Sequence, residues 1–408
     1  MNVRRSAAAL AAIGVLAAAA PATAATAAPS PKAAVPAGLF GKSDPTYDGV
    51  WRQSLALLAQ TTVGERPADP AVKWLAGQAC ADGGFASFRA DTGKACGGKG
   101  AQADTNSTAA AIQALTAVGG HDDVTGKAVA WLKKQQNKDG GWGYAPGGPS
   151  DTNSTSVVTG ALAAAGEKPA GLRGKGKTPG EALAALAVPC DEDGGGALAY
   201  QPDKKGKLIA NEDATAAGVL GALGKGFVVE PGKARAKAPA CTSDGKATPA
   251  RLADNASAHL IGAVAKSGHL MSALPGAEKQ PDFGNTADTV VALAANGWTG
   301  QAEAPYAWLE KNAAKWAEQS GPAAYAQLIL SAHAVGADPR DFGGTDLVRG
   351  LDKLGPAPAK AATAKPSGAA EEKATEKSGN SVWWIIGVGL VAGIGVGFLF
   401  SGRKKNRP

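Results

Sequence analysis

Two kinds of helical pattern alternate along the chain between about residue 42 and residue 354. In the first kind, apolar residues recur every three or four positions and charged residues take the opposite side, as around Trp131 and Leu132. A helix with one wet side belongs on the outside of a fold. We therefore expect outer helices at residues 68–79, 123–136, 179–188, 250–266, 303–317 and 344–354.

The second kind is almost free of charge beyond its first turn. The segments "DTNSTAAAIQALTAVG" from Asp104 and "DTNSTSVVTGALAAAG" from Asp151 open on residues that cap a helix and end in glycine, which favours a helix stop. A helix that is apolar on nearly all sides must be buried. This pattern predicts inner helices at residues 46–60, 104–118, 151–165, 211–224, 285–296 and 321–336.

The two kinds together form six pairs, and no pair can bury its own inner helix alone. Closing the six pairs into a ring buries every inner helix and leaves no end to be capped. The predicted fold is therefore all-α, an (α/α)6 toroid of six inner and six outer helices. An open helical solenoid is the alternative arrangement of the same pairs.

Both ends of the chain predict export and anchoring. Residues 1–28 pair two arginines with an apolar run and small residues, which is typical of a signal peptide. Residues 382–400 carry no charge over the length of a membrane span, and the basic residues 401–408 predict a cytoplasmic tail. We divide the rest into a linker (29–41), the toroid domain (42–354) and a flexible stalk (355–380). The toroid is expected outside the cell, on a single-pass membrane protein.

Cysteine usage and charge narrow the functional classes. Four cysteines in an exported segment favour two disulfides. Three pairings are open for Cys80, Cys96, Cys190 and Cys241, and neighbours in order close the shortest loops. The spacing of cysteine and histidine predicts no metal site. The net charge of +7 includes both termini, so the mildly basic domain is not expected to bind nucleic acid.

The element "QQNKDGGWG", Gln135 to Gly143, resembles the repeat of squalene cyclases, terpene cyclases and protein prenyltransferases. The inner helices that open on Asp-Thr resemble more closely the corrinoid-binding transcobalamin and intrinsic-factor branch of the same toroid. In such repeats the element joins an outer helix to the next inner one. We expect Gln135 or Gln136 to bond the helix-end carbonyls, Gly140 and Gly141 to permit the turn, and Trp142 to cover the junction.

The first turns of the inner helices carry more polar side chains than capping needs. Six such starts would meet at one mouth of the ring, where helix N-termini would present converging N–H donors to a polar ligand. The predicted ligand-binding residues are Asp104, Thr105, Asn106, Asp151, Thr152, Asn153, Asp213, Asn285 and Asp288. Gly321 and Pro322 open the sixth inner helix, so this row of polar starts is broken there.

No catalytic residue is predicted. The acid motif of a squalene-type cyclase has only "DED" at Asp191 to Asp193 as a counterpart, and that string lies in a glycine-rich turn. Aromatic residues are only 5% of the chain, which disfavours a cavity lined to guide carbocations. The four histidines are too scattered to form the zinc site of a prenyltransferase.

These observations favour a membrane-anchored extracellular protein that binds a bulky small molecule at its polar mouth. No cofactor is certain, and a corrinoid is the ligand that the resemblance implies. Corrinoid carriers close a second domain over the ligand, so a lid from another chain and delivery to a membrane transporter would complete the picture. The alternatives are a prenyltransferase-like or terpene-cyclase-like enzyme acting on an isoprenoid, and a cell-surface adhesion or scaffold module.

Overall fold

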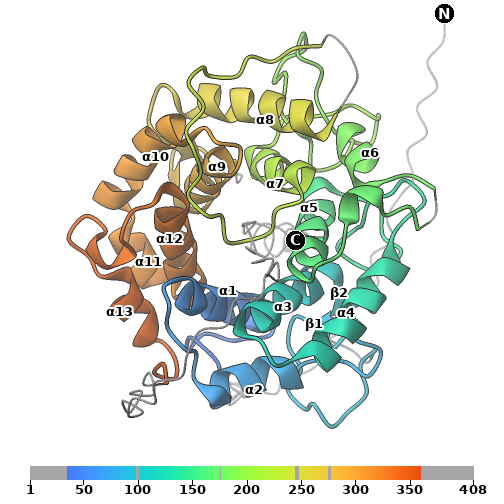
Figure 1. Cartoon of the computed structure of the whole chain (residues 1–408), viewed down its shortest axis with the longest axis vertical. Helices are drawn as coiled ribbons and strands as arrows, with labels where there is room; N and C mark the ends of the chain where they lie inside the picture. Colours follow the sequence, from blue (N-terminus) through green and yellow to red (C-terminus); the bar gives the residue numbers. More distant parts are fainter. Residues whose placement is uncertain (1–34, 98–100, 175, 244–247, 274–276, 360–408) are drawn as a thin grey trace, which may run out of the picture. The chain divides into compact units, whose positions relative to one another are not determined.

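The computed structural model describes residues 35–97, 101–174, 176–243, 248–273 and 277–359. Its helices lie in two concentric layers around a ring (Figure 1). Among the described residues the inner layer consists of α1 (Gly49–Thr62), α3 (Thr105–Val118), α5 (Thr152–Ala164), α7 (Glu212–Leu223), α9 (Phe283–Ala295) and α12 (Pro322–Val335). Each inner helix packs against the next, and α12 packs back against α1. The ring is therefore closed, and the solenoid alternative is wrong.

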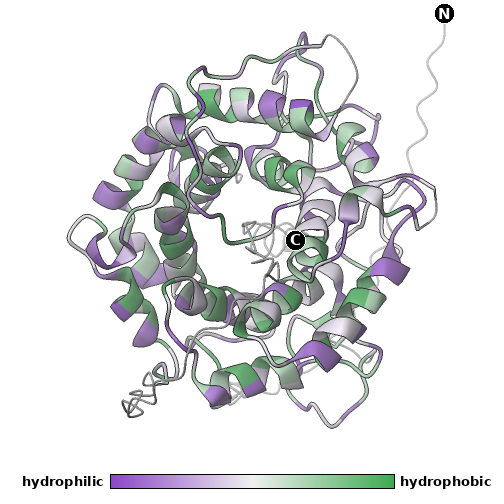
Figure 2. Cartoon of the chain, in the orientation of Figure 1, coloured by the Kyte–Doolittle hydropathy of each residue, from purple (hydrophilic) through white to green (hydrophobic). Residues whose placement is uncertain are grey.

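The outer layer covers the inner one from outside. It consists, within the described ranges, of α2 (Asp69–Gly77), α4 (Asp122–Gln135), α6 (Pro179–Ala184), α8 (Pro249–Val264), α10 (Thr299–Asn312), α11 (Ala314–Ser320) and α13 (Leu347–Asp352). The single outer helix predicted at 303–317 is instead two helices that meet at Ala313. Figure 2 shows hydrophilic residues on these outer helices and hydrophobic ones along the inner layer, as the sequence pattern predicts.

Short elements fill the connections. Two antiparallel hairpins pair β1 (Phe85–Ala86) with β2 (Ala103–Asp104) and β3 (Leu270–Met271) with β4 (Pro281–Asp282). The 3-10 helices η1 (Pro169–Gly171) and η2 (Pro339–Asp341) follow α5 and α12. Each hairpin ends where an inner helix begins, so it fixes the direction in which that helix enters the ring.

Residues next to the predicted ring also pack against it. Phe40 is fully buried, and the backbone N–H of Gly41 donates to Leu354 O at 2.8 Å. At the other end, the N–H of Ala359 donates to Arg66 O at 2.9 Å. The signal peptide, most of the stalk and the membrane span predicted at 382–400 lie outside the described residues. Within the described part of the chain, no helix is long and apolar enough to cross a membrane.

The two disulfides join neighbours in sequence order. Cys80 bonds Cys96, and Cys190 bonds Cys241. The pairing that closes the shortest loops is therefore confirmed.

The turn predicted to join α4 to α5 has a different bonding pattern from the expected one. The indole N–H of Trp142 donates to the helix-end carbonyl of Leu132 at 2.7 Å, whereas Gln136 Nε2 donates to Gly140 O within the turn. The tryptophan thus makes the bond that we had assigned to a glutamine, because the fully buried indole lies directly against the last turn of α4. Gly140 adopts a φ of 90°, which a residue with a side chain rarely takes.

The segment after α7, residues 224–231, crosses the centre of the ring (Figure 1), and we call it the plug. Its apolar residues Phe227, Val228 and Val229 are 0%, 8% and 1% exposed. The N–H of Phe227 donates to the side-chain oxygen of Gln113 on α3 at 2.7 Å, and its ring meets Trp51 on α1 edge to face at 5.3 Å. The plug therefore packs apolar side chains against α1 and α3 on the inside of the ring.

Two charged residues fasten the plug to the other side of the ring. Lys225 Nζ donates to Ala295 O at the end of α9 at 2.7 Å, and Glu230 pairs with His333 of α12 at 3.2 Å. The plug thus contacts α1 and α3 on one side of the ring and α9 and α12 on the other.

Candidate functional site

The first turns of four inner helices gather at one end of the ring. We call residues 104–108, 151–155, 211–215 and 282–286 the polar mouth. Asn153 Nδ2 on α5 donates to Asp213 Oδ2 on α7 at 2.9 Å, which shows that the neighbouring starts are in contact. Asp213 is also close enough to Asp282, before α9, for the two carboxylates to repel. The predicted gathering of polar starts is therefore present along this arc.

Each helix start is capped by its own side chain. The capping oxygens accept from the N–H three residues on, at 2.6 Å for Asp104, 2.7 Å for Asp151, 2.8 Å for Asn211 and 3.0 Å for Asp282. The first N–H groups of α3 and α5 donate to Tyr144 O and Tyr200 O. These amides are already bonded, so the expectation of converging N–H donors at the mouth is wrong for α3 and α5.

A threonine four residues after each cap ties the helix to the preceding turn. The hydroxyl oxygens accept from a buried backbone N–H, in the pairs Thr108 with Phe85 (2.8 Å), Thr155 with Trp142 (3.0 Å), Thr215 with Leu198 (2.9 Å) and Thr286 with Leu270 (3.0 Å). We did not predict this role, although its signal was visible as a threonine at the same position of four helix starts. Part of the excess polarity at these starts is therefore structural.

The predicted residues divide between internal bonding and the mouth. The hydroxyls of Thr105 and Thr152 donate to Gly143 O at 2.7 Å and Ala199 O at 2.6 Å. Asn106 is buried beside Thr105. Asp288 lies in the second turn of α9, where it receives Gln327 Nε2 of α12 at 3.3 Å. The structure thus brings Asn153 and Asp213 together, and Asp288 belongs to a deeper contact.

Five oxygen atoms of the polar mouth have no hydrogen-bond partner among the described residues. They are Oδ2 of Asp151, Oδ1 of Asn153, Oγ of Ser154, Oδ1 of Asp213 and Oδ1 of Asn285, and each is shielded from solvent. In Asn153, Asp213 and Asn285 a side-chain partner occupies the other oxygen or nitrogen of the same group, as in the bond from Asn285 Nδ2 to Asp282 Oδ2. Leaving a buried acceptor unpaired costs about 1–3 kcal/mol. The two amide oxygens accept only, whereas the Ser154 hydroxyl and a protonated carboxyl can also donate, so donors on a ligand would match Asn153 and Asn285 first.

Burial raises the pKa of three carboxyls of the mouth. It raises the pKa of Asp104 and of Asp213 to about 7, and that of Asp151 to about 6, against opposing hydrogen bonds at each group. Burial also raises the pKa of Tyr144 and Tyr200, with the neighbouring aspartates adding to the effect. These carboxyls therefore exchange protons near neutral pH while both phenols keep theirs.

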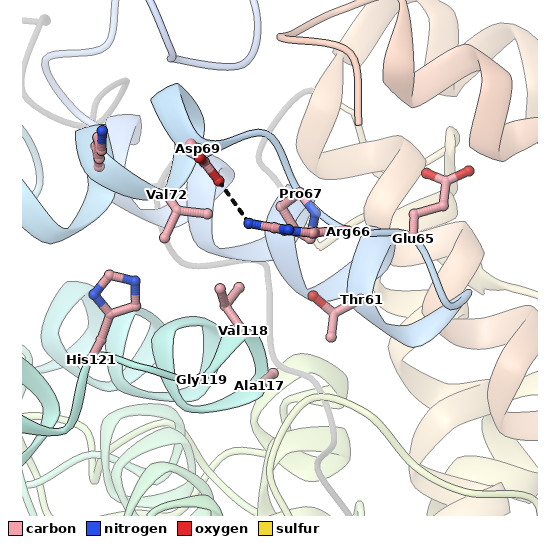
Figure 3. Close-up of a pocket in the computed structure, with 11 residues that line it drawn as sticks. Thr61, Glu65, Arg66, Pro67, Asp69, Val72, Ala117, Val118, Gly119 and His121 are labelled. Atoms are coloured by element: carbon pink, nitrogen blue, oxygen red, sulfur yellow. Dashed lines mark hydrogen bonds and ion pairs between the residues drawn. The ribbon is translucent and has the colours of Figure 1, made fainter. Parts of the chain in front are cut away.

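A separate cleft lies at the opposite ends of the inner helices, between the C-termini of α1 and α3 (Figure 3). Its volume is about 520 Å³, and none of the predicted site residues line it. Two ion pairs border it, Arg66 with Asp69 at 3.3 Å and Glu65 with Arg340 at 3.4 Å. Lys73 also lines the cleft, and Glu65 Oε2 is buried without a hydrogen-bond partner in the described part of the chain.

Metal chemistry receives no geometric support from the described residues. They contain no group of three histidine, cysteine, aspartate or glutamate side chains placed to hold an ion. The mouth is thus described by hydrogen bonding and by the protonation of its carboxyls.

No family model and no curated protein matches the chain. Among solved structures, it is similar to ent-copalyl diphosphate synthase from Streptomyces platensis, with 14% identity, a TM-score of 0.46 and coverage of 71% of this chain and 50% of that one. It is also similar to the type II terpene cyclase MstE from Scytonema, with 14% identity, a TM-score of 0.44 and coverage of 68% and 73%. This chain spans half the length of the Streptomyces platensis enzyme.

These neighbours are terpene cyclases, so they lend no support to the corrinoid-carrier side of the resemblance. At such identities and TM-scores they carry no argument about activity either. The function therefore has to be argued from the mouth and the plug themselves.

Proposed function

We propose that the polar mouth binds a bulky small molecule rich in hydrogen-bond donors. The observation that carries this proposal is the row of unpaired acceptor oxygens on Asn153, Asp213 and Asn285. A ligand with amide or hydroxyl donors would satisfy them, and the plug below would act as the floor of the site. A corrinoid, with its rim of amide groups, is one molecule of this kind.

The plug weighs against the isoprenoid enzyme. An isoprenoid chain needs an apolar cavity, and Phe227 and Val229 occupy the centre of the ring with 0% and 1% exposure. A buried aspartic acid with a raised pKa is the one feature that favours acid-initiated cyclisation, and Asp104 and Asp213 have it. The enzyme remains the second candidate for that reason, and the same experiment includes a substrate-like probe.

The test is native mass spectrometry and calorimetry of the full chain with cobalamin, cobinamide and a polyprenyl phosphate. We expect a retained corrinoid, and binding at least tenfold weaker in the double variant Asp151→Asn with Asp213→Asn. Asp123→Asn is the matched control, because Asp123 is exposed in the first turn of α4. Retention of the polyprenyl phosphate alone, or equal corrinoid binding by the double variant, would overturn the proposal.

A further inference from the structure

Four aromatic rings stack in series beside the start of α9. The ring centroids are 4.1 Å apart for His269 and Trp308, 5.1 Å for Trp308 and Phe283, and 5.6 Å for Phe283 and Trp316. Their planes lie within 30° of one another. We call these four residues the aromatic stack. It joins α9, α10, α11 and the turn before β3, which are separate elements of the chain.

The stack reaches the edge of the polar mouth. Phe283 and Gly284 are the first two residues of α9, and Gly284 takes the position that Asn153 has on α5 and Asp213 has on α7. A Cβ atom at Gly284 would lie 3.6 Å from Nε2 of Gln327 and 3.8 Å from Cζ2 of Trp316. The edge of the indole and the Gln327 amide therefore border the position where the neighbouring helices carry Asn153 and Asp213.

The rings of the stack are only partly buried. All four residues are half-buried, whereas Trp142 and Trp298 elsewhere in the ring are almost fully covered. Two tryptophans left in contact with solvent are costly, since each ring has a large apolar area that burial would stabilise. The mouth thus has two sides, unpaired oxygen acceptors on α5 and α7 and accessible ring surface at α9.

We infer that Trp316, backed by Phe283, forms a stacking platform for the apolar face of a ring in the ligand, while the acceptor side binds donors on the edge of that ring. This inference rests on ligand binding at the mouth and specifies the ligand class. The ligand is a ring system with donors around its edge and an apolar face. Both a corrin macrocycle and an N-acetylated sugar ring have this chemistry.

The test is calorimetric titration of the full chain with two separate probes, cobinamide and N-acetylchitotetraose, each with the native chain and with Trp316→Ala. We expect one probe to bind the native chain, and binding at least tenfold weaker in the variant. Phe283→Leu keeps an apolar side chain but removes the ring, and we expect several-fold weaker binding. Trp74→Ala is the matched control, since Trp74 stacks on Phe88 at 6.4 Å on α2.

The outcomes separate the two proposals. Unchanged binding in both Trp316→Ala and Phe283→Leu, with binding still lost in the aspartate double variant, overturns the stacking platform and leaves the ligand site intact. Binding of neither probe to the native chain overturns the stacking platform for this class of ring. An equal loss in Trp74→Ala also overturns it, because the effect would then be one of general stability.

Discussion

The polar mouth and the plug are two regions of the same ring that differ in what they bury. The plug buries apolar side chains whose backbone is hydrogen-bonded, and the mouth buries polar atoms that have no partner among the described residues. In the plug, Phe227 and Val229 are out of water and the N–H of Phe227 has a side-chain partner at 2.7 Å. In the mouth, Asn153 and Asp213 keep buried oxygens without a partner. The difference teaches that the centre of the ring is built for stability, whereas the mouth retains unfavourable polar burial that a ligand would relieve.

The largest effect is expected from emptying the centre. Phe227→Ala removes a fully buried ring that contacts Trp51. The free energy of unfolding should therefore fall by about 4 kcal/mol. Denaturant unfolding measures it. Ile209→Ala is the control, because Ile209 is 58% exposed and should change stability by no more than about 0.5 kcal/mol. A loss below about 1 kcal/mol for Phe227→Ala would contradict a filled centre.

A slightly smaller effect is expected where α5 touches the plug. A Cβ atom at Gly160 would lie 2.4 Å from Gly226 Cα and 2.7 Å from Lys225 O, so Gly160→Ala must displace the plug backbone. We expect a loss of about 3 kcal/mol despite the better helix propensity of alanine. Gly126→Ala in α4, where nothing lies within 4 Å, should instead gain up to about 1 kcal/mol. If both variants gained stability, the backbone of the plug would have to be able to move away from the new methyl group.

In the mouth, removing a buried carboxyl is predicted to raise the stability of the fold instead of lowering it. Burial raises the pKa of Asp104 to about 7 in the fold, from 3.8 for an ordinary aspartate, so the folded state holds the proton more tightly. Its contribution to stability is therefore full below about pH 4 and is lost as the pH rises to about 7. Asp104→Asn removes this loss, and it should be more stable than the native chain by about 2 kcal/mol at pH 8.

Thermal unfolding at pH 5 and pH 8 checks this prediction. The advantage of Asp104→Asn should be less than half as large at pH 5, because the folded carboxyl is still protonated there and only the unfolded chain has lost its proton. Asparagine caps a helix as well as aspartate does, so the bond to the Ser107 N–H is kept. An advantage that is the same at both pH values would show that charge burial is not the cause.

The sequence predicts the ring well and the plug not at all. Two helical periods, with caps such as Asp104 and Asp151, were enough to place all six inner helices, because burial on every side leaves a strong apolar signal. Residues 224–231 have no period and only a short apolar run at Phe227 to Val229. Their position depends on contacts with helices far away in the sequence, such as the bond to Gln113.

The sequence predicts that polar helix starts gather at one end of the ring, but it does not predict whether they offer hydrogen-bond donors or acceptors. Helix starts rich in Asp, Thr and Asn lie at one end of the ring, since parallel inner helices bring their N-termini together. Whether a start offers donors or acceptors depends on which groups the fold uses internally. Tyr144 O and Tyr200 O, from turns outside the motif, take the first amides, and oxygens such as Asn153 Oδ1 are left buried without a partner in the described ranges.

The smallest effect is expected from Thr155→Val, which tests whether this threonine of the mouth stabilises the fold without contacting the ligand. Thr155→Val keeps the shape of the side chain but removes the hydroxyl that accepts from the Trp142 N–H, so about 1 kcal/mol of stability should be lost. Thr159→Val should lose less, because Thr159 bonds only the carbonyl of Thr155 within its own helix. Ligand affinity should stay within twofold in both variants. A tenfold loss of affinity in Thr155→Val would mean that the threonine contacts the ligand as well, and that one residue serves both stability and binding.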